Sequence, residues 1–67
     1  MRITVNGKEE HLPRGMDVEA FLQSKGVRLE EVVVELNREI IAREKWRETI
    51  IKENDNLEIL HFMGGGK

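Results

Sequence analysis

Few residues in this chain are of the types that carry out chemistry. His11 and His61 lie far apart in the sequence, and neither has the spacing to another histidine that a metal site requires. The adjacent glutamates at 9–10 and at 30–31 are expected to point apart into water rather than to act together as acid and base. There is no cysteine, which excludes a thiol nucleophile, a disulfide and a thiolate metal site. We therefore predict that the chain is not an enzyme and has no metal site.

The remaining candidate is a run of three glycines near the C-terminus. Gly64, Gly65 and Gly66 have no Cβ atoms and directly follow an expected strand, so they can extend into a channel too narrow for other side chains. On composition alone, such a run also fits a frayed chain end. The functional interpretation is that this tail presents a backbone carboxylate to an active site on another protein.

Composition and charge restrict the classes of protein to which the chain can belong. Its 67 residues are enough for one small domain with a thin core. Thirteen acidic and 11 basic residues give a net charge of −2, which provides no positive field for nucleic acid. The longest apolar runs, 32–34 and 40–42, are too short to cross a bilayer, and the N-terminus lacks the apolar stretch of a signal peptide. We expect a soluble, cytoplasmic protein that binds neither nucleic acid nor membrane.

The first half of the chain predicts a hairpin followed by a helix. Apolar residues alternate over 1–5, which indicates a strand, and Asn6-Gly7 favours a tight turn into a returning strand at 8–12. Asp17 is a typical residue to cap the start of a helix, and Gly26 is typical of the position just after one. We therefore expect a helix at about 18–25.

The second half predicts further strands. Residues 32–36 alternate as in a strand, Asn37-Arg38 suggests a turn, and 39–42 follow as a short strand. Charges alternate around Trp46 over residues 43–49 without an apolar stripe, which suggests a helical turn or loop held by one large side chain.

The end of the chain completes the expected fold. Residues 54–56 form a strong turn signal, and 57–63 read as the last strand. This order of elements fits one helix packed across a mixed sheet of four to five strands, with the first and last strands in its middle, as in ubiquitin. We expect an α+β domain over residues 1–63, followed by a flexible glycine tail over 64–67.

Alternation in the last strand also predicts an exposed apolar patch. If the odd-numbered residues of this strand face the helix, Leu60 and Phe62 point to the opposite face, where Val33 also points. One helix covers only one face of a sheet, so these residues, with Met63 beside them, are candidates for binding a partner. The alternative is that the strand twists at its end and tucks Phe62 against the sheet edge.

Two segments and one turn residue resemble a known family. The stretch from Asn37 to Trp46, Asp55 in the following turn, and the segment from Leu57 to Gly66 are similar to the ThiS family, the sulfur carriers of thiamine biosynthesis. The resemblance extends over essentially the whole chain. The double glycine alone is weakly specific, because ubiquitin-like proteins in general share it. The fold implied is the ubiquitin-like β-grasp, which agrees with the predicted order of elements.

The resemblance implies a mechanism and partners. An adenylating enzyme of the ubiquitin-activating type would bind the tail and ATP, and the Gly66 carboxylate would attack the α-phosphate to form an acyl adenylate. A persulfide on another protein would then displace AMP and leave a thiocarboxylate, whose sulfur thiazole synthase would incorporate into the thiazole ring. The chain itself would bind no cofactor. Its lack of cysteine is compatible with this role, because the sulfur is held on the terminal carbonyl.

Lys67 departs from the family pattern, in which the chain ends at the second glycine. With Lys67 attached, the carbonyl of Gly66 belongs to an amide and cannot be adenylated as a carboxylate. Either a protease trims Lys67, or the residue is foreign to the natural protein, or the enzyme accepts a Lys67 carboxylate. The last option fits least well, because the long charged side chain of Lys67 does not suit a channel that is only wide enough for glycine.

Two alternatives for the function remain open at this point. The small subunit of molybdopterin synthase also uses a terminal Gly-Gly thiocarboxylate as a sulfur donor. A ubiquitin-like interaction or conjugation module would instead join its tail to a lysine through an isopeptide bond.

Overall fold

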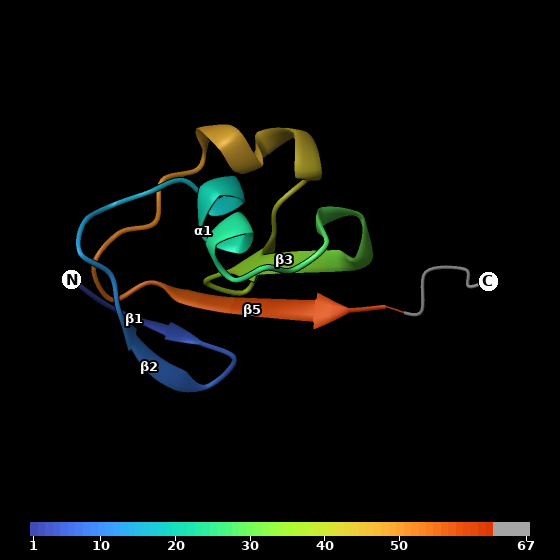
Figure 1. Cartoon of the computed structure of the whole chain (residues 1–67). Coiled ribbons are helices and arrows are strands. Elements are labelled where there is room, and N and C mark those ends of the chain that lie inside the picture. Colours follow the sequence, from blue (N-terminus) through green and yellow to red (C-terminus); the bar gives the residue numbers. More distant parts are fainter. Residues whose placement is uncertain (63–67) are drawn as a thin grey trace.

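The structure is a computed structural model that describes residues 1–62, and it consists of a sheet with helices on one side (Figure 1). Met63 and the tail predicted over residues 64–67 lie outside the described residues. No helix within residues 1–62 is long and apolar enough to span a membrane. In chain order, the elements are β1 (Arg2–Val5), β2 (Lys8–His11), α1 (Val18–Ser24), η1 (Leu29–Glu31), β3 (Val32–Leu36), β4 (Glu39–Ile40), η2 (Arg43–Glu48) and β5 (Asn56–His61), where η marks a 3-10 helix.

The N-terminal hairpin forms where the sequence predicts it. Asn6 and Gly7 have φ angles of 51° and 81°, the positive values that a tight hairpin turn requires. The Asn6 side chain has a second role, because its Oδ1 accepts from the Ile59 amide at 2.7 Å and its Nδ2 donates to the Ile59 carbonyl at 3.3 Å. Asn6 thereby continues the pairing of β1 with β5 after the backbone of β1 has turned away.

The helix is capped at both ends by the predicted residues. Asp17 Oδ1 accepts a hydrogen bond from the Ala20 amide at 2.8 Å. Gly26 has a φ of 75°, and its amide bonds back to the Gln23 carbonyl at 3.0 Å, as in a Schellman cap. The short helix α1 therefore ends at Ser24, and its inner face buries Val18, Phe21 and Leu22.

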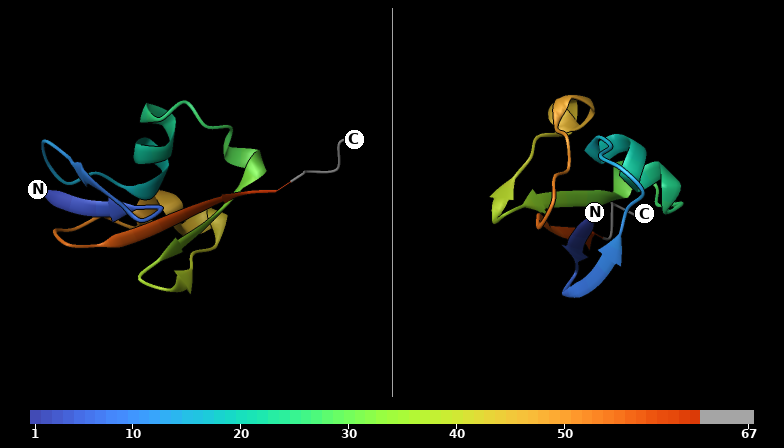
Figure 2. Two further views of the ribbon diagram at one scale, coloured as in Figure 1. Left: turned by 90° about the horizontal axis from the view of Figure 1, so that it is seen from below. Right: turned by 90° about the vertical axis from the view of Figure 1, so that its left-hand side faces the viewer.

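The sheet has the order β2-β1-β5-β3-β4. β1 and β5 run parallel in its middle, and the other neighbouring strands pair antiparallel. This mixed sheet with one main helix confirms the predicted α+β architecture and has the β-grasp arrangement. Figure 2 shows α1 and η2 on the same side of the sheet, so neither of these helices covers its other face.

Several boundaries differ from the predicted ones. β4 ends at Ile40 rather than at residue 42, because Ala42 already serves as the N-cap of η2. β5 begins at Asn56, one residue early, since the Asn56 amide donates to Asn37 Oδ1 at 2.9 Å. The helix η1 was not predicted, because three residues are too few to show a helical period.

The core lies between the sheet and the helices. Trp46 is only 2% exposed, and its indole Nε1 donates to the Ile41 carbonyl at 3.0 Å, which confirms that it holds the 43–48 segment in place. The other buried apolar residues come from both layers: Ile3, Val5, Leu12, Val18, Phe21, Leu22, Val32, Val34, Ile51, Leu57 and Ile59.

Candidate functional site

β5 is the element that leads toward the glycine run. It lies between β1, which pairs with its first two residues, and β3, which pairs along it from Leu57 to His61. Pairing with the chain before β3 continues past its end, where the Phe62 amide donates to the Glu31 carbonyl at 3.1 Å. The predicted reactive residues Gly64, Gly65 and Gly66 lie outside the described residues, as does Met63. The chain up to Phe62 is therefore held by the sheet.

The uncovered face of the sheet carries the predicted apolar residues at this end of β5. Val33 lies directly opposite Leu60 in the β3–β5 ladder. Leu60 and Phe62 are 47% and 48% exposed, whereas Leu57 and Ile59 of the same strand are buried toward the helix. Phe62 is thus about half-exposed rather than buried at the sheet edge, and strand alternation continued past His61 puts it on the open face. Whether these residues bind a partner stays a prediction.

Ile40 extends this surface and was not among the residues predicted from the sequence. It lies opposite Glu35 across β3 and β4, and Glu35 points to the same face as Val33 by alternation. The Ile40 side chain is 67% exposed. The two-residue turn at 37–38 implied this register, because such a turn places residues 35 and 40 opposite each other. We call Val33, Ile40, Leu60 and Phe62 the outer patch.

Two carboxylates lie within the same face. Glu35 of β3 is directly opposite Glu58 of β5, and both residues are half-buried. Neither carboxylate forms an ion pair or a side-chain hydrogen bond with any residue in 1–62. This pair was not predicted from the sequence, because the two residues are far apart in the chain.

The two adjacent glutamate pairs behave differently from each other. Glu9 faces Arg2 at 3.5 Å, whereas Glu10 Oε1 lies 2.6 Å from Lys25 Nζ, so this pair points apart as expected. Glu30 and Glu31 instead both contact the Arg28 guanidinium at 3.2 Å, which corrects the expectation that they point apart into water.

The surroundings of Glu30 shift its titration. A backbone hydrogen bond at Glu30 and a side-chain hydrogen bond from Arg28 hold the pKa of this carboxyl below its ordinary value. It therefore stays ionised at neutral pH. Because its pKa is lowered and Arg28 contacts it, Glu30 is no candidate for acid–base chemistry.

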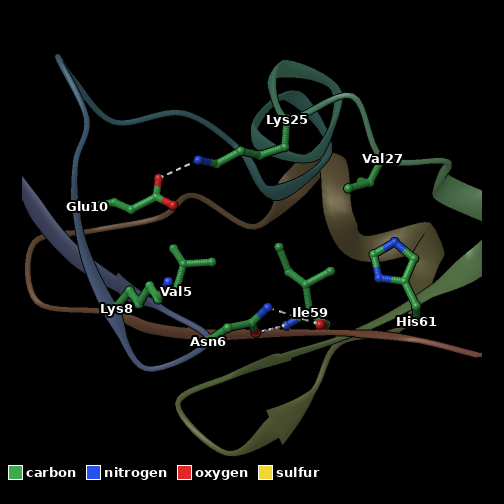
Figure 3. A pocket seen from close by; sticks show the side chains of 8 residues that line it. All are labelled: Val5, Asn6, Lys8, Glu10, Lys25, Val27, Ile59 and His61. Atoms are coloured by element: carbon green, nitrogen blue, oxygen red, sulfur yellow. Dashed lines mark hydrogen bonds and ion pairs between the residues drawn. The ribbon is translucent and has the colours of Figure 1, made fainter.

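A pocket of about 430 Å³ opens on the opposite, helix-covered side of the sheet. Figure 3 shows the Glu10–Lys25 ion pair at one end and the His61 ring at the other, above a floor that includes Val5 and Ile59. The side chains of residues 1–62 that line it include no hydroxyl and no thiol. Within the described residues, no group of three or more His, Asp or Glu side chains could hold a metal ion.

Comparison with known proteins places these features in context. The ThiS family model matches residues 1–66. The sulfur carrier protein ThiS of Bacillus subtilis is 34% identical over 65 residues, and the match covers 96% of this chain and 98% of that protein. The crystal structure of the thiamine biosynthesis protein ThiS from Geobacter metallireducens superposes with a TM-score of 0.87 at 40% identity, covering 98% of this chain and 100% of that one.

A longer protein also contains a segment similar to this chain. The thiazole synthase of Paramagnetospirillum magneticum is 38% identical over 66 residues, which are 98% of this chain. The chain spans only 20% of the length of that relative.

Proposed function

The chain belongs to the ThiS family of sulfur carriers in thiamine biosynthesis, and we propose that it carries its sulfur as a thiocarboxylate on Gly66. The family resemblance drawn from the sequence is confirmed. The observation that carries the proposal is the family match over residues 1–66, which extends to the last glycine and leaves out Lys67. Membership of this family argues against the molybdopterin synthase and conjugation alternatives.

The proposed chemistry occurs on the terminal carbonyl carbon. A Gly66 carboxylate oxygen attacks the α-phosphorus of ATP on an adenylating enzyme of the ubiquitin-activating type, and pyrophosphate leaves. The terminal sulfur of a protein persulfide then attacks the acyl carbon, and AMP leaves. A second thiol reduces the resulting sulfur–sulfur bond, which releases the thiocarboxylate. This chain is a co-substrate in these steps and needs no side chain of its own to react.

Thiazole synthase is the proposed recipient of the sulfur. The support for this partner is that a protein named thiazole synthase contains a segment 38% identical to this chain. The adenylating enzyme and the persulfide protein follow from the chemistry, which requires an activated acyl group and a sulfur donor. ATP is used by the adenylating enzyme and is not a cofactor of the carrier, and we place these reactions in the cytoplasm.

We assign the binding of the partner enzymes to Val33, Leu60, Phe62 and Met63, together with Ile40. Glycines offer a partner few side-chain contacts, whereas most binding energy at protein interfaces comes from a few buried apolar anchors. The exposed Leu60 and Phe62 precede the glycine run by only a few residues, so an enzyme that holds them also positions the chain end.

The proposed reaction predicts a defined change in mass. A chain ending at Gly66, incubated with its adenylating enzyme, ATP and a persulfide donor, should gain about 16 Da as one oxygen is replaced by sulfur. The chain ending at Lys67 should gain nothing, because its Gly66 carbonyl is an amide. Intact-mass spectrometry measures both. Thiocarboxylation of the Lys67 carboxylate without trimming would contradict the assignment to Gly66.

The docking assignment predicts that a charge on the outer patch weakens binding. Leu60→Asp places a carboxylate where an apolar contact is expected, so its Kd for thiazole synthase should rise about tenfold or more. Fluorescence anisotropy of a labelled carrier measures the Kd. Ile50→Asp is the matched control, since Ile50 is also 50% exposed but lies outside the outer patch. Equal losses in the two variants would remove the outer patch from the mechanism.

A further inference from the structure

The face that carries the outer patch also holds a pair of charges that the carrier leaves without a partner within residues 1–62. Glu35 and Glu58 are directly opposite each other on β3 and β5. The next pair along the same face is Val33 and Leu60, and Ile40 flanks Glu35 on the other side. The carboxylates thus lie among the apolar residues of the outer patch rather than at a distant site.

This arrangement is unfavourable for the carrier on its own. Like charges directly opposite each other on neighbouring strands destabilise a sheet. Some other acidic side chains in residues 1–62 have basic partners, such as Glu10 with Lys25 at 2.6 Å and Glu19 with Arg47 at 3.6 Å. Glu35 and Glu58 have none in the described part of the chain, and both are half-buried, where water screens their repulsion less completely.

A single cation from a partner would relieve this repulsion. We propose that Glu35 and Glu58 together bind one basic side chain of thiazole synthase, preferably an arginine, next to the apolar contacts that Val33, Leu60 and Ile40 provide. The planar guanidinium has several N–H groups in a fixed fork and can donate to two carboxylates at once, which a lysine ammonium does less specifically. This inference rests on the proposed function, because that function supplies the partner enzyme.

The acidic pair would contribute specificity as well as affinity. An apolar patch alone accepts many apolar surfaces, whereas two carboxylates beside it, without a cationic partner in residues 1–62, disfavour any surface that lacks a cation. The pair therefore selects a partner that presents a positive charge between apolar side chains. It also discourages association of the carrier with a second copy of itself, because two such faces would bring four carboxylates together.

The test is the double variant Glu35→Gln/Glu58→Gln, which keeps the side-chain shapes and removes both charges. Its Kd for thiazole synthase should rise about tenfold or more at low salt, because the cation of the partner loses both opposing negative charges. The Kd of the wild-type chain should rise between about 0.05 and 0.3 M salt, and that of the variant should rise much less. The Tm of the variant should equal or exceed that of the wild-type chain, because repulsion has been removed.

The matched control is Glu44→Gln/Glu48→Gln, which changes the net charge equally. Both of these residues are exposed, and η2, which carries them, lies on the helix side of the sheet (Figure 2). This control should bind within about twofold of the wild-type chain. If both double variants bind alike, the acidic pair has no specific role and the inference is overturned, although the proposed function stands. If the wild-type chain fails to bind thiazole synthase at all, the proposed partner is wrong, and the inference falls with it.

Discussion

Replacing Gly65 by leucine in a chain that ends at Gly66 is expected to reduce thiocarboxylate formation by about a hundredfold or more. The proposed adenylation requires the tail to enter an active site on another protein and to place the Gly66 carboxylate in line with the α-phosphorus of ATP. A leucine side chain at position 65 obstructs that channel, and a displacement of about 1 Å in a reacting group is enough for a loss of this size. Intact-mass spectrometry over a time course measures the rate.

Two controls show whether thiocarboxylate formation slows because leucine is too large for the channel. Gly65→Ala adds only one methyl group and should give an intermediate rate. The Tm of both variants should match that of the unsubstituted chain, because every buried residue of the described core lies within residues 3–59. If a Gly65→Leu chain is activated at the normal rate, the channel does not require glycine. The proposal that the glycines are needed to enter a narrow active site would then be wrong.

Replacing Phe21 by alanine is expected to have the largest effect on the fold. Phe21 is 1% exposed and is the largest of the fully buried side chains, so its removal leaves a cavity between α1 and the sheet. Such a substitution costs about 3 to 5 kcal/mol. A domain of this size has a free energy of unfolding of only about 3 to 10 kcal/mol. A large fraction of the variant should therefore be unfolded at 37 °C, as urea titration followed by circular dichroism would show.

Phe62→Ala is the matched control for this experiment. It removes the same side chain from a residue that is 48% exposed, so the free energy of unfolding should fall by less than about 1 kcal/mol. A comparable loss in the two variants would mean that Phe62 belongs to the core rather than to an open face. That outcome would also remove the reason for assigning docking to the outer patch.

The turns and the helix ends of this chain are determined by local chemistry. Asn6-Gly7 predicted the hairpin because both residues tolerate positive φ, and the structure places them at 51° and 81°. Asp17 and Gly26 predicted the helix because an acceptor side chain satisfies the first free amides and glycine accepts the left-handed position after the last turn. Each of these preferences acts over a few residues, which a sequence displays directly.

Alternation also determined which side of β5 is exposed. The strand period of two assigned Leu60 and Phe62 to the face away from the helix, and both are about half-exposed there. The family resemblance came from this stretch with its glycines, together with Asp55 and the segment from Asn37 to Trp46. The boundaries of β4 and β5 were predicted less accurately, because strand ends depend on which neighbour supplies the next hydrogen bond.

Only the tertiary structure decided which distant residues meet. Asn6 bonds the backbone of Ile59, 53 residues later, through its side chain, and Asn37 bonds the backbone of Asn56. Glu35 faces Glu58 because β3 and β5 pair in one particular register. A shift of that register by one residue would turn every side chain of a strand to the other face. Such pairings depend on how the strands align as the whole core packs, so no local pattern in the sequence specified the acidic pair beside the outer patch.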